Sequence, residues 1–192
     1  MTSLTVTTTT EPNPQASTPA NTIRTIAAGL FGGLALGVVA RAWMRFISDG
    51  PEFTWSGTIF ILAAFTIFGI TQSISTATRR RPHRQATRVI ARVVGFAGLL
   101  PLFIGAGAMM LPTVVGGGLA VARTGWARRA RAACLIVALI PVLVIGGFLA
   151  GTFGWSARTL LGFLAMIALY ATIVRAGRAT FAPPPSGLRL PR

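Results

Sequence analysis

The sequence predicts an all-α fold, a polytopic transmembrane helix bundle, and three observations support this prediction. First, the 192-residue chain is 53% hydrophobic and only 11% charged, whereas soluble domains carry about 25% charged residues. Second, the basic side chains are all arginine, and they cluster between long apolar stretches. Third, five uncharged runs follow one another, at residues 25–40, 53–78, 93–122, 132–157 and 159–174. Runs of this length are typical of helices that cross a bilayer.

Composition divides the chain into three parts. Residues 1–22 are rich in Thr, Pro, Ser and Asn and hold one acid, Glu11. They have too little apolar surface to fold, so they are expected to form a disordered N-terminal tail. Residues 23–178 are expected to form the transmembrane helical domain, and residues 179–192 a flexible C-terminal tail.

A cleaved signal peptide is the competing interpretation of residues 1–42. Arg24 precedes an apolar stretch, and Ala40-Arg41-Ala42 loosely matches a small-x-small cleavage site. However, the tail before Arg24 is long and contains no basic residue, and an arginine inside the site is unfavourable. We therefore favour an uncleaved first span.

Candidate spans lie near 24–47, 57–78, 88–111, 131–152 and 156–178. The positive-inside rule tests this count, because every loop is short. Five spans leave eight arginines on one side and ten on the other. If residues 88–130 instead cross twice as a tight pair, fifteen of the eighteen arginines are inside. Only Arg41, Arg45 and Arg158 are then outside. The charge distribution therefore favours about six membrane segments with both termini inside, and five spans are the alternative.

The tight pair is short for two crossings. Thirty uncharged residues separate Arg92 from Arg123, and two full spans need about 40. The pair fits if both arginines lie about one turn inside the membrane and snorkel outward. A re-entrant hairpin that does not fully cross gives the same sidedness. Gly105 through Pro112 offers a flexible reversal, and kinks are expected at Pro101 and, in a later span, at Pro141.

Glycine spacing predicts where helices approach closely. Gly29, Gly33 and Gly37 are spaced by four along the first span, and Gly147 and Gly151 repeat the spacing later. Such small-xxx-small ridges allow close helix packing in membranes. The alternative explanation is that glycine is simply common in membrane helices. We favour packing for the first ridge and leave the second open.

A candidate polar site joins the first two spans. Arg41 and Arg45 are four residues apart, so they share one helix face, and Asp49 and Glu52 follow them. Ionisable groups at membrane depth are functional candidates. The competing interpretation, which we favour, is an interfacial anchor with a salt-bridged turn.

The same segment carries a resemblance. Arg41-Ala42-Trp43-Met44-Arg45 and Pro51-Glu52-Phe53-Thr54-Trp55-Ser56-Gly57-Thr58 resemble an R-x-W-M-R, then P-E-F-x-W-S-G-T, pattern of uncharacterised actinobacterial membrane proteins. The resemblance covers residues 41–58. It implies a small multi-span membrane protein and carries no known activity.

The loop between the second and third spans is strongly basic. Its candidate docking residues are Arg79, Arg80, Arg81, Arg84 and Arg88. Because they lie at the ends of apolar segments, they are expected to set orientation and to bind anionic lipid headgroups. An acidic protein partner is the alternative, and nucleic acid is an unlikely partner.

The residue types present argue against a metal, haem or catalytic site. His83 is the only histidine and Cys134 the only cysteine, so the chain alone cannot supply a Cys/His zinc cluster or bis-histidine haem ligation. We therefore predict no catalytic residue, cofactor or metal, and no enzyme.

The expected function is that of a multi-pass protein of the cell (plasma) membrane. It would be an accessory or scaffold protein that packs with other membrane proteins, with its own copies in a homo-oligomer, or with anionic lipid of the bilayer. The alternative is a small transporter or channel in which Arg41 attracts an anion.

Overall fold

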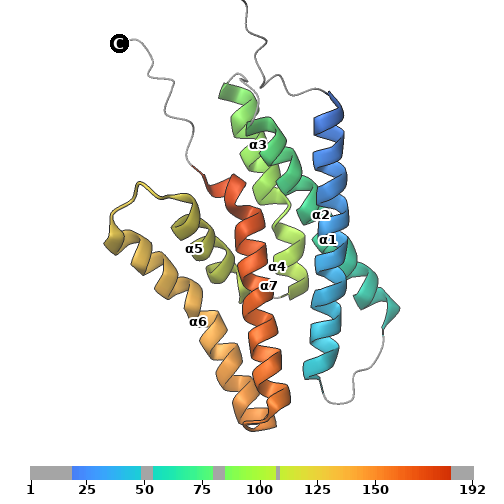
Figure 1. Cartoon of the computed structure of the whole chain (residues 1–192), viewed down its shortest axis with the longest axis vertical. Helices are drawn as coiled ribbons and strands as arrows, with labels where there is room; N and C mark the ends of the chain where they lie inside the picture. The colour runs from blue at the N-terminus through green and yellow to red at the C-terminus, as the bar shows by residue number, and fades with distance from the viewer. Residues whose placement is uncertain (1–18, 49–53, 80–84, 107–108, 183–192) are drawn as a thin grey trace, which may run out of the picture.

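The computed structural model describes residues 19–48, 54–79, 85–106 and 109–182 (Figure 1). These residues form seven helices: α1 (Pro19–Ile47), α2 (Trp55–Arg79), α3 (Gln85–Ala97), α4 (Leu100–Ala106), α5 (Met110–Ala122), α6 (Arg128–Phe153) and α7 (Ala157–Phe181). Within α1, α2, α6 and α7 lie four stretches that are long and apolar enough to cross a membrane. The predicted all-α transmembrane bundle is confirmed.

Side-chain contacts define the direction of each helix. Arg92 in the second half of α3 donates to the carbonyl of Ala182, just after α7, and the two helices run in opposite directions (Figure 1). Thr113 in α5 donates to the Ala138 carbonyl in α6. Arg131 at the start of α6 donates to the Ala120 carbonyl near the end of α5. These two contacts show that α5 and α6 run antiparallel to each other. The start of α1, the end of α2, the start of α3, the α5–α6 turn and the end of α7 all lie toward the same end of the bundle (Figure 1).

The third crossing is broken between α3 and α4. Proline lacks the N–H that a helix needs, and it disfavours helical geometry in the residue before it. Pro101 accordingly lies in the first turn of α4, and Gly98 and Leu99 form a turn in front of it. Leu99 is 1% exposed, so the break is held inside the core. The kink predicted at Pro101 is a full interruption of the helix.

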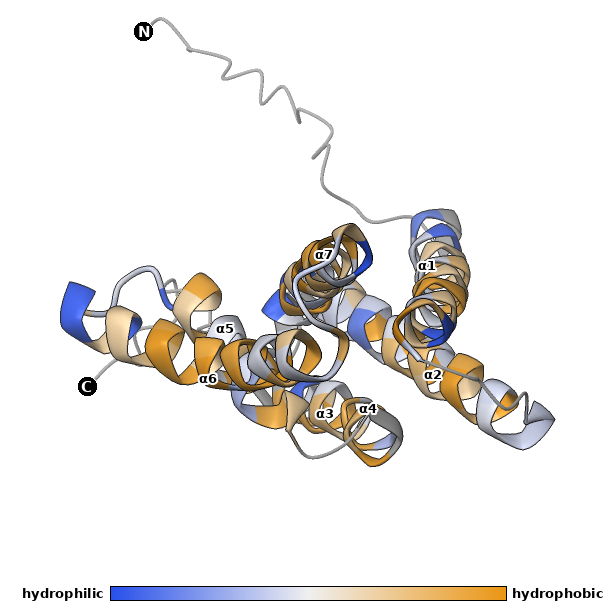
Figure 2. Cartoon of the chain, turned by 90° about the horizontal axis from the view of Figure 1, so that it is seen from below, coloured by the Kyte–Doolittle hydropathy of each residue, from blue (hydrophilic) through white to orange (hydrophobic). Residues whose placement is uncertain are grey.

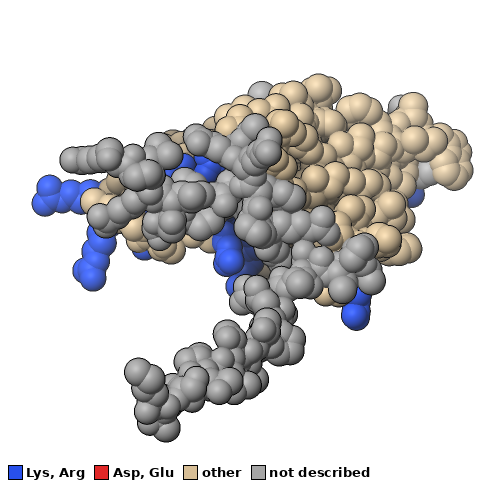
Figure 3. All heavy atoms as spheres, turned by 90° about the horizontal axis from the view of Figure 1, so that it is seen from above, with Lys and Arg blue, Asp and Glu red and all other residues tan. Residues whose placement is uncertain are grey.

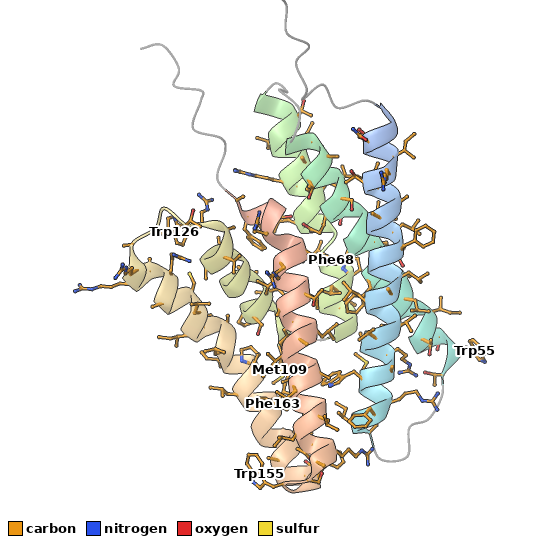
Figure 4. The ribbon with its side chains drawn as sticks, in the orientation of Figure 1. Trp55, Phe68, Met109, Trp126, Trp155 and Phe163 are labelled. Atoms are coloured by element: carbon orange, nitrogen blue, oxygen red, sulfur yellow. The ribbon has the colours of Figure 1, made fainter. Side chains whose placement is uncertain are left out.

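The chain then reverses between Ala106 and Met109. α5 has 13 residues, about 20 Å at 1.5 Å per residue, which is shorter than the roughly 30 Å core of a bilayer. In Figure 4, Met109 lies level with Phe163 of α7 and well short of Trp155 at the far end. The segment 85–122 therefore runs into the bundle and back without reaching that end.

Two helix ends differ from the predicted domain boundaries by about one turn. α1 begins at Pro19, although residues 19–22 were assigned to the tail; proline is well suited to the first turn of a helix. α7 continues to Phe181, past the predicted end at residue 178. Phe181 is 3% exposed and meets the ring of Phe96 edge-on at 5.3 Å, and this contact holds the last turn. Residues 1–18 and 183–192 lie outside the described residues.

The core is formed by side chains of α2, α4, α5 and α7 and of the turn before α4. Its most buried side chains are Phe68, Leu99, Leu102, Met166, Ile173 and Val114. The outward faces of α1 and α6 are apolar as well (Figure 2), and they expose large side chains such as Phe31 and Phe148. An apolar surface around an apolar core is what a lipid-facing bundle requires.

Candidate functional site

The predicted polar site is partly described. Arg41 is half-buried, and its Nε donates to Thr58 Oγ1 at 3.1 Å. That hydroxyl in turn donates to the Thr54 carbonyl at 3.0 Å. The guanidinium therefore links the end of α1 to the start of α2. Asp49 and Glu52 lie outside the described residues, so their pairing with Arg41 or Arg45 stays a prediction.

A neighbouring contact, which the sequence did not suggest, joins α1 to α7. Arg158 donates from Nε to the Phe46 carbonyl at 2.7 Å and from Nη2 to the Ser48 carbonyl at 3.0 Å. The last carbonyls of a helix have no partner within it, and Arg158 supplies one. Trp43 Nε1 adds a bond to the Gly162 carbonyl at 2.7 Å. Hydrogen bonds from Arg158 and Trp43 therefore join α1 to α7 at this end of the bundle.

A buried polar group, here called the Gln72 cluster, links α2, α3 and α7. It consists of Gln72, Ser75, Ala91, Gly95 and Thr180. Gln72 Nε2 donates to the Gly95 carbonyl at 3.1 Å, and Gln72 Oε1 accepts from Thr180 Oγ1 at 2.7 Å. Ser75 donates to the Ala91 carbonyl at 2.8 Å. Gln72, Ser75 and Thr180 are each at most 4% exposed, so these bonds fix three helices to one another.

The sequence alone could not reveal the Gln72 cluster. Gln72 and Thr180 are 108 residues apart, and nothing in the residues around either one indicates that the two meet. Only the fold shows that they meet. Gly95 has a role here as well, because a Cβ at that position would lie 2.9 Å from Ser75 Oγ.

The glycine ridge of α1 faces α2. A Cβ at Gly29 would lie 2.5 Å from the Gly69 carbonyl, and one at Gly37 would lie 3.2 Å from Leu62 Cα. A Cβ at Gly33 would overlap the Phe65 carbonyl oxygen. Gly69 of α2 is the matching residue on the other helix, and no glycine repeat in α2 predicts it. On α6, by contrast, a Cβ at Gly147 or Gly151 would meet nothing within 4 Å.

The described arginines gather at one end of the bundle. Figure 3 views this end, where blue side chains appear around the rim. By their helix positions, the arginines of this end are Arg24, Arg79, Arg88, Arg92, Arg123, Arg128, Arg129, Arg131, Arg175 and Arg178. Arg80, Arg81 and Arg84 of the predicted docking loop lie outside the described residues. The opposite end carries Arg41, Arg45 and Arg158.

The turn between α5 and α6, residues 123–131, is called the arginine turn below. Arg131 Nε donates to the Ala120 carbonyl at 3.1 Å. The Arg123 guanidinium lies over the Trp126 ring, 5.6 Å from its centroid. Arg123 Nε is buried and has no hydrogen-bond partner among the described residues. Arg128 and Arg129 are exposed.

Among the described residues, no group of three His, Cys, Asp or Glu side chains could hold a metal ion; His83 and all three acids of the chain lie outside them. No protein-family model, curated protein or solved structure matches the chain significantly. The resemblance of residues 41–58 to actinobacterial membrane proteins therefore stays a prediction.

Proposed function

We propose that this chain is a non-enzymatic accessory or scaffold protein of the cell membrane, and that it packs against other membrane proteins through α6. The observation that carries the proposal is the position of α6. α6 contacts the rest of the bundle mainly through α5, which lies between α7 and the first half of α6 (Figure 1). Most of its apolar length therefore faces away from the bundle.

The outer face of α6 has the composition of a helix-packing surface. Ile140, Leu143 and Phe148 are at least half exposed there, and open space surrounds Gly147 and Gly151. Small residues allow a second helix to approach closely, and the large ones beside them supply van der Waals contact. The buried polar side chains of the Gln72 cluster support the proposal too. They bond to neighbouring helices, so they serve packing within the bundle rather than a path for a substrate.

We further propose about six membrane segments with both termini in the cytoplasm. The end of the bundle that carries most of the described arginines also carries the start of α1 and the end of α7 (Figure 1). Short loops rich in arginine are retained on the cytoplasmic side. In this topology α3–α4 and α5 form the re-entrant pair.

Photo-cross-linking tests the scaffold role. p-Benzoylphenylalanine is placed at Phe148 of α6 or, as the control, at Phe31 of α1; these side chains are 67% and 68% exposed. The protein is irradiated in its native membrane, and adducts are identified by mass spectrometry. We expect a defined protein adduct from Phe148 alone. Lipid adducts alone from both positions would contradict the role.

A small transporter or channel is the second candidate. Interrupted or short membrane helices often line substrate paths, and the α3–α4 break and the 13-residue α5 have this form. Arg41 would then attract an anion at the opposite end. Anion flux into liposomes that falls in Arg41→Gln but not in Arg24→Gln would support this candidate and displace the scaffold role.

A further inference from the structure

We infer that the arginine turn binds one anionic phospholipid by its headgroup phosphate. This inference deepens the proposed function by naming a lipid partner and its site, and it does not require a protein partner. The site lies at the junction of α5 and α6, away from the basic 79–92 loop where the sequence analysis placed lipid docking.

The charges of the arginine turn are unbalanced. Four arginines occur within nine residues, at positions 123, 128, 129 and 131, and no acid accompanies them. Three of them lie in the first turn of α6, where the helix macrodipole disfavours cations. The helix begins after Ala127 with no side-chain cap and no acidic residue in its first turn. An anion placed there would be favoured by both the side chains and the helix dipole.

Two arginines of the turn have different hydrogen-bond environments. Arg131 is engaged, since its Nε donates to the Ala120 carbonyl. Arg123 lies over the Trp126 ring, and its buried Nε lacks an acceptor among the described residues. A buried donor without an acceptor is costly. Because the buried Nε is closed to lipid, a phosphate would bind the other N–H groups of the Arg123 guanidinium, which stays charged and presents a planar fork of donors.

The position of the turn identifies the source of the phosphate. Trp126 is exposed at the tip of the turn, at the arginine-rich end (Figure 4), and tryptophan is enriched at the headgroup level of membranes. Directly below the turn, α6 exposes Leu135 and Ile136. A phosphate bound at the turn would therefore have apolar helix surface beside it for acyl chains. This combination fits a lipid rather than a free phosphate ion.

The test uses the full-length protein in nanodiscs of phosphatidylcholine with a minor fraction of phosphatidylglycerol. Lipids retained after release from the nanodisc are counted by native mass spectrometry. We expect wild type to retain phosphatidylglycerol selectively. Arg123→Gln and the double variant Arg128→Gln/Arg129→Gln should each lower that retention about fivefold or more, the effect of removing a basic group that contacts the bound anionic headgroup. The control Arg24→Gln, an exposed arginine of α1 at the same end, should retain wild-type levels.

Gel filtration verifies that each variant is monodisperse, and the double variant alters only exposed side chains. Equal retention in wild type and in the double variant would overturn the inference, as would an equal loss in Arg24→Gln. Selective binding of added inorganic phosphate in pure phosphatidylcholine would also overturn it. The Phe148 cross-link reports on the scaffold role separately, since it requires no anionic lipid.

Discussion

Gly32 and Gly33 are adjacent in α1, yet their surroundings are opposite. A Cβ at Gly33 would overlap the Phe65 carbonyl and lie 3.1 Å from Thr66 Cα, whereas a Cβ at Gly32 would meet nothing within 4 Å. Backbone atoms cannot move aside as the end of a flexible side chain can. The spacing of glycines by four in the sequence distinguishes Gly33 from Gly32, and the structure shows the cause.

We expect Gly33→Ala to lower the free energy of unfolding by about 1–3 kcal/mol, the usual cost of overpacking. Gly32→Ala should be neutral or stabilising by up to about 1 kcal/mol, since alanine favours helix. Unfolding in mixed micelles, followed by circular dichroism, measures both variants. Equal stability of the two would mean that α1 and α2 do not pack through this face.

Gly154 has a conformational role that sequence spacing does not reveal. It ends α6 with φ 67° and ψ 179°, a region of backbone space that is essentially restricted to glycine. It has open space around it, so side-chain volume is not the constraint. The turn into α7 depends on this backbone geometry.

Gly154→Ala is accordingly expected to destabilise the protein by about 1–3 kcal/mol through backbone strain alone. Gly151→Ala is the matched control, because Gly151 also has open space but lies within α6. It should leave stability unchanged or slightly raised. The same unfolding measurement decides the point, and a neutral Gly154→Ala would show that the turn relaxes to another conformation.

At the scale of the element, polar side chains hold the helices in register. The Gln72 cluster joins α2 to α3 and α7, and Thr113 joins α5 to α6. The hydrophobic effect contributes little to the association of helices in lipid, so van der Waals packing and interhelical hydrogen bonds contribute more. An unsatisfied polar group inside the bundle would cost about 1–3 kcal/mol.

A double-mutant cycle on Gln72→Leu and Thr180→Val measures this bond. Each single variant should lower the free energy of unfolding by about 1–2 kcal/mol, since each leaves a buried polar partner unpaired. The pair should be coupled by about 0.5–1.7 kcal/mol, the range seen between membrane helices. Additive effects would argue that the two side chains act independently.

At the scale of the whole molecule, the helices form a bundle with strongly unequal ends. The short hairpin of α3–α4 and α5 enters from the arginine-rich end and returns to it (Figure 1). This reversal brings the arginines of residues 123–131 to the same end as Arg79, Arg88 and Arg92. The proposed topology follows from that asymmetry and the positive-inside rule.

Cysteine accessibility in intact cells tests the topology. In a Cys134→Ser background, a membrane-impermeant maleimide should label Ala157→Cys but not Thr124→Cys; both positions are exposed in the structure. Permeabilised cells provide the control, because both variants should then react. Labelling of Thr124→Cys alone would reverse the orientation. Labelling of both in intact cells would contradict a bundle with these two turns at opposite ends.

Much of the architecture could be predicted from the sequence, because hydropathy and charge act locally. A run of apolar residues between arginines predicts a helix, and Pro101 predicted a kink at the point where the helix is interrupted. The count of arginines per loop even predicted the tight pair over residues 88–130. Helix ends were less predictable, since the last turn of α7 depends on Phe181 meeting Phe96 in another helix.

The candidate sites were harder to predict. The sequence alone determined that this is a helical membrane protein with arginine between its apolar segments, and it identified Gly33 and Arg41 as residues of interest. Only the tertiary structure showed that Arg41 bonds to Thr58, that Gln72 meets Thr180, and that Arg123 has a buried, unpaired Nε. The physical reason is range: the length and hydropathy of a helix depend on consecutive residues, whereas polar contacts inside a bundle depend on which faces of distant helices meet.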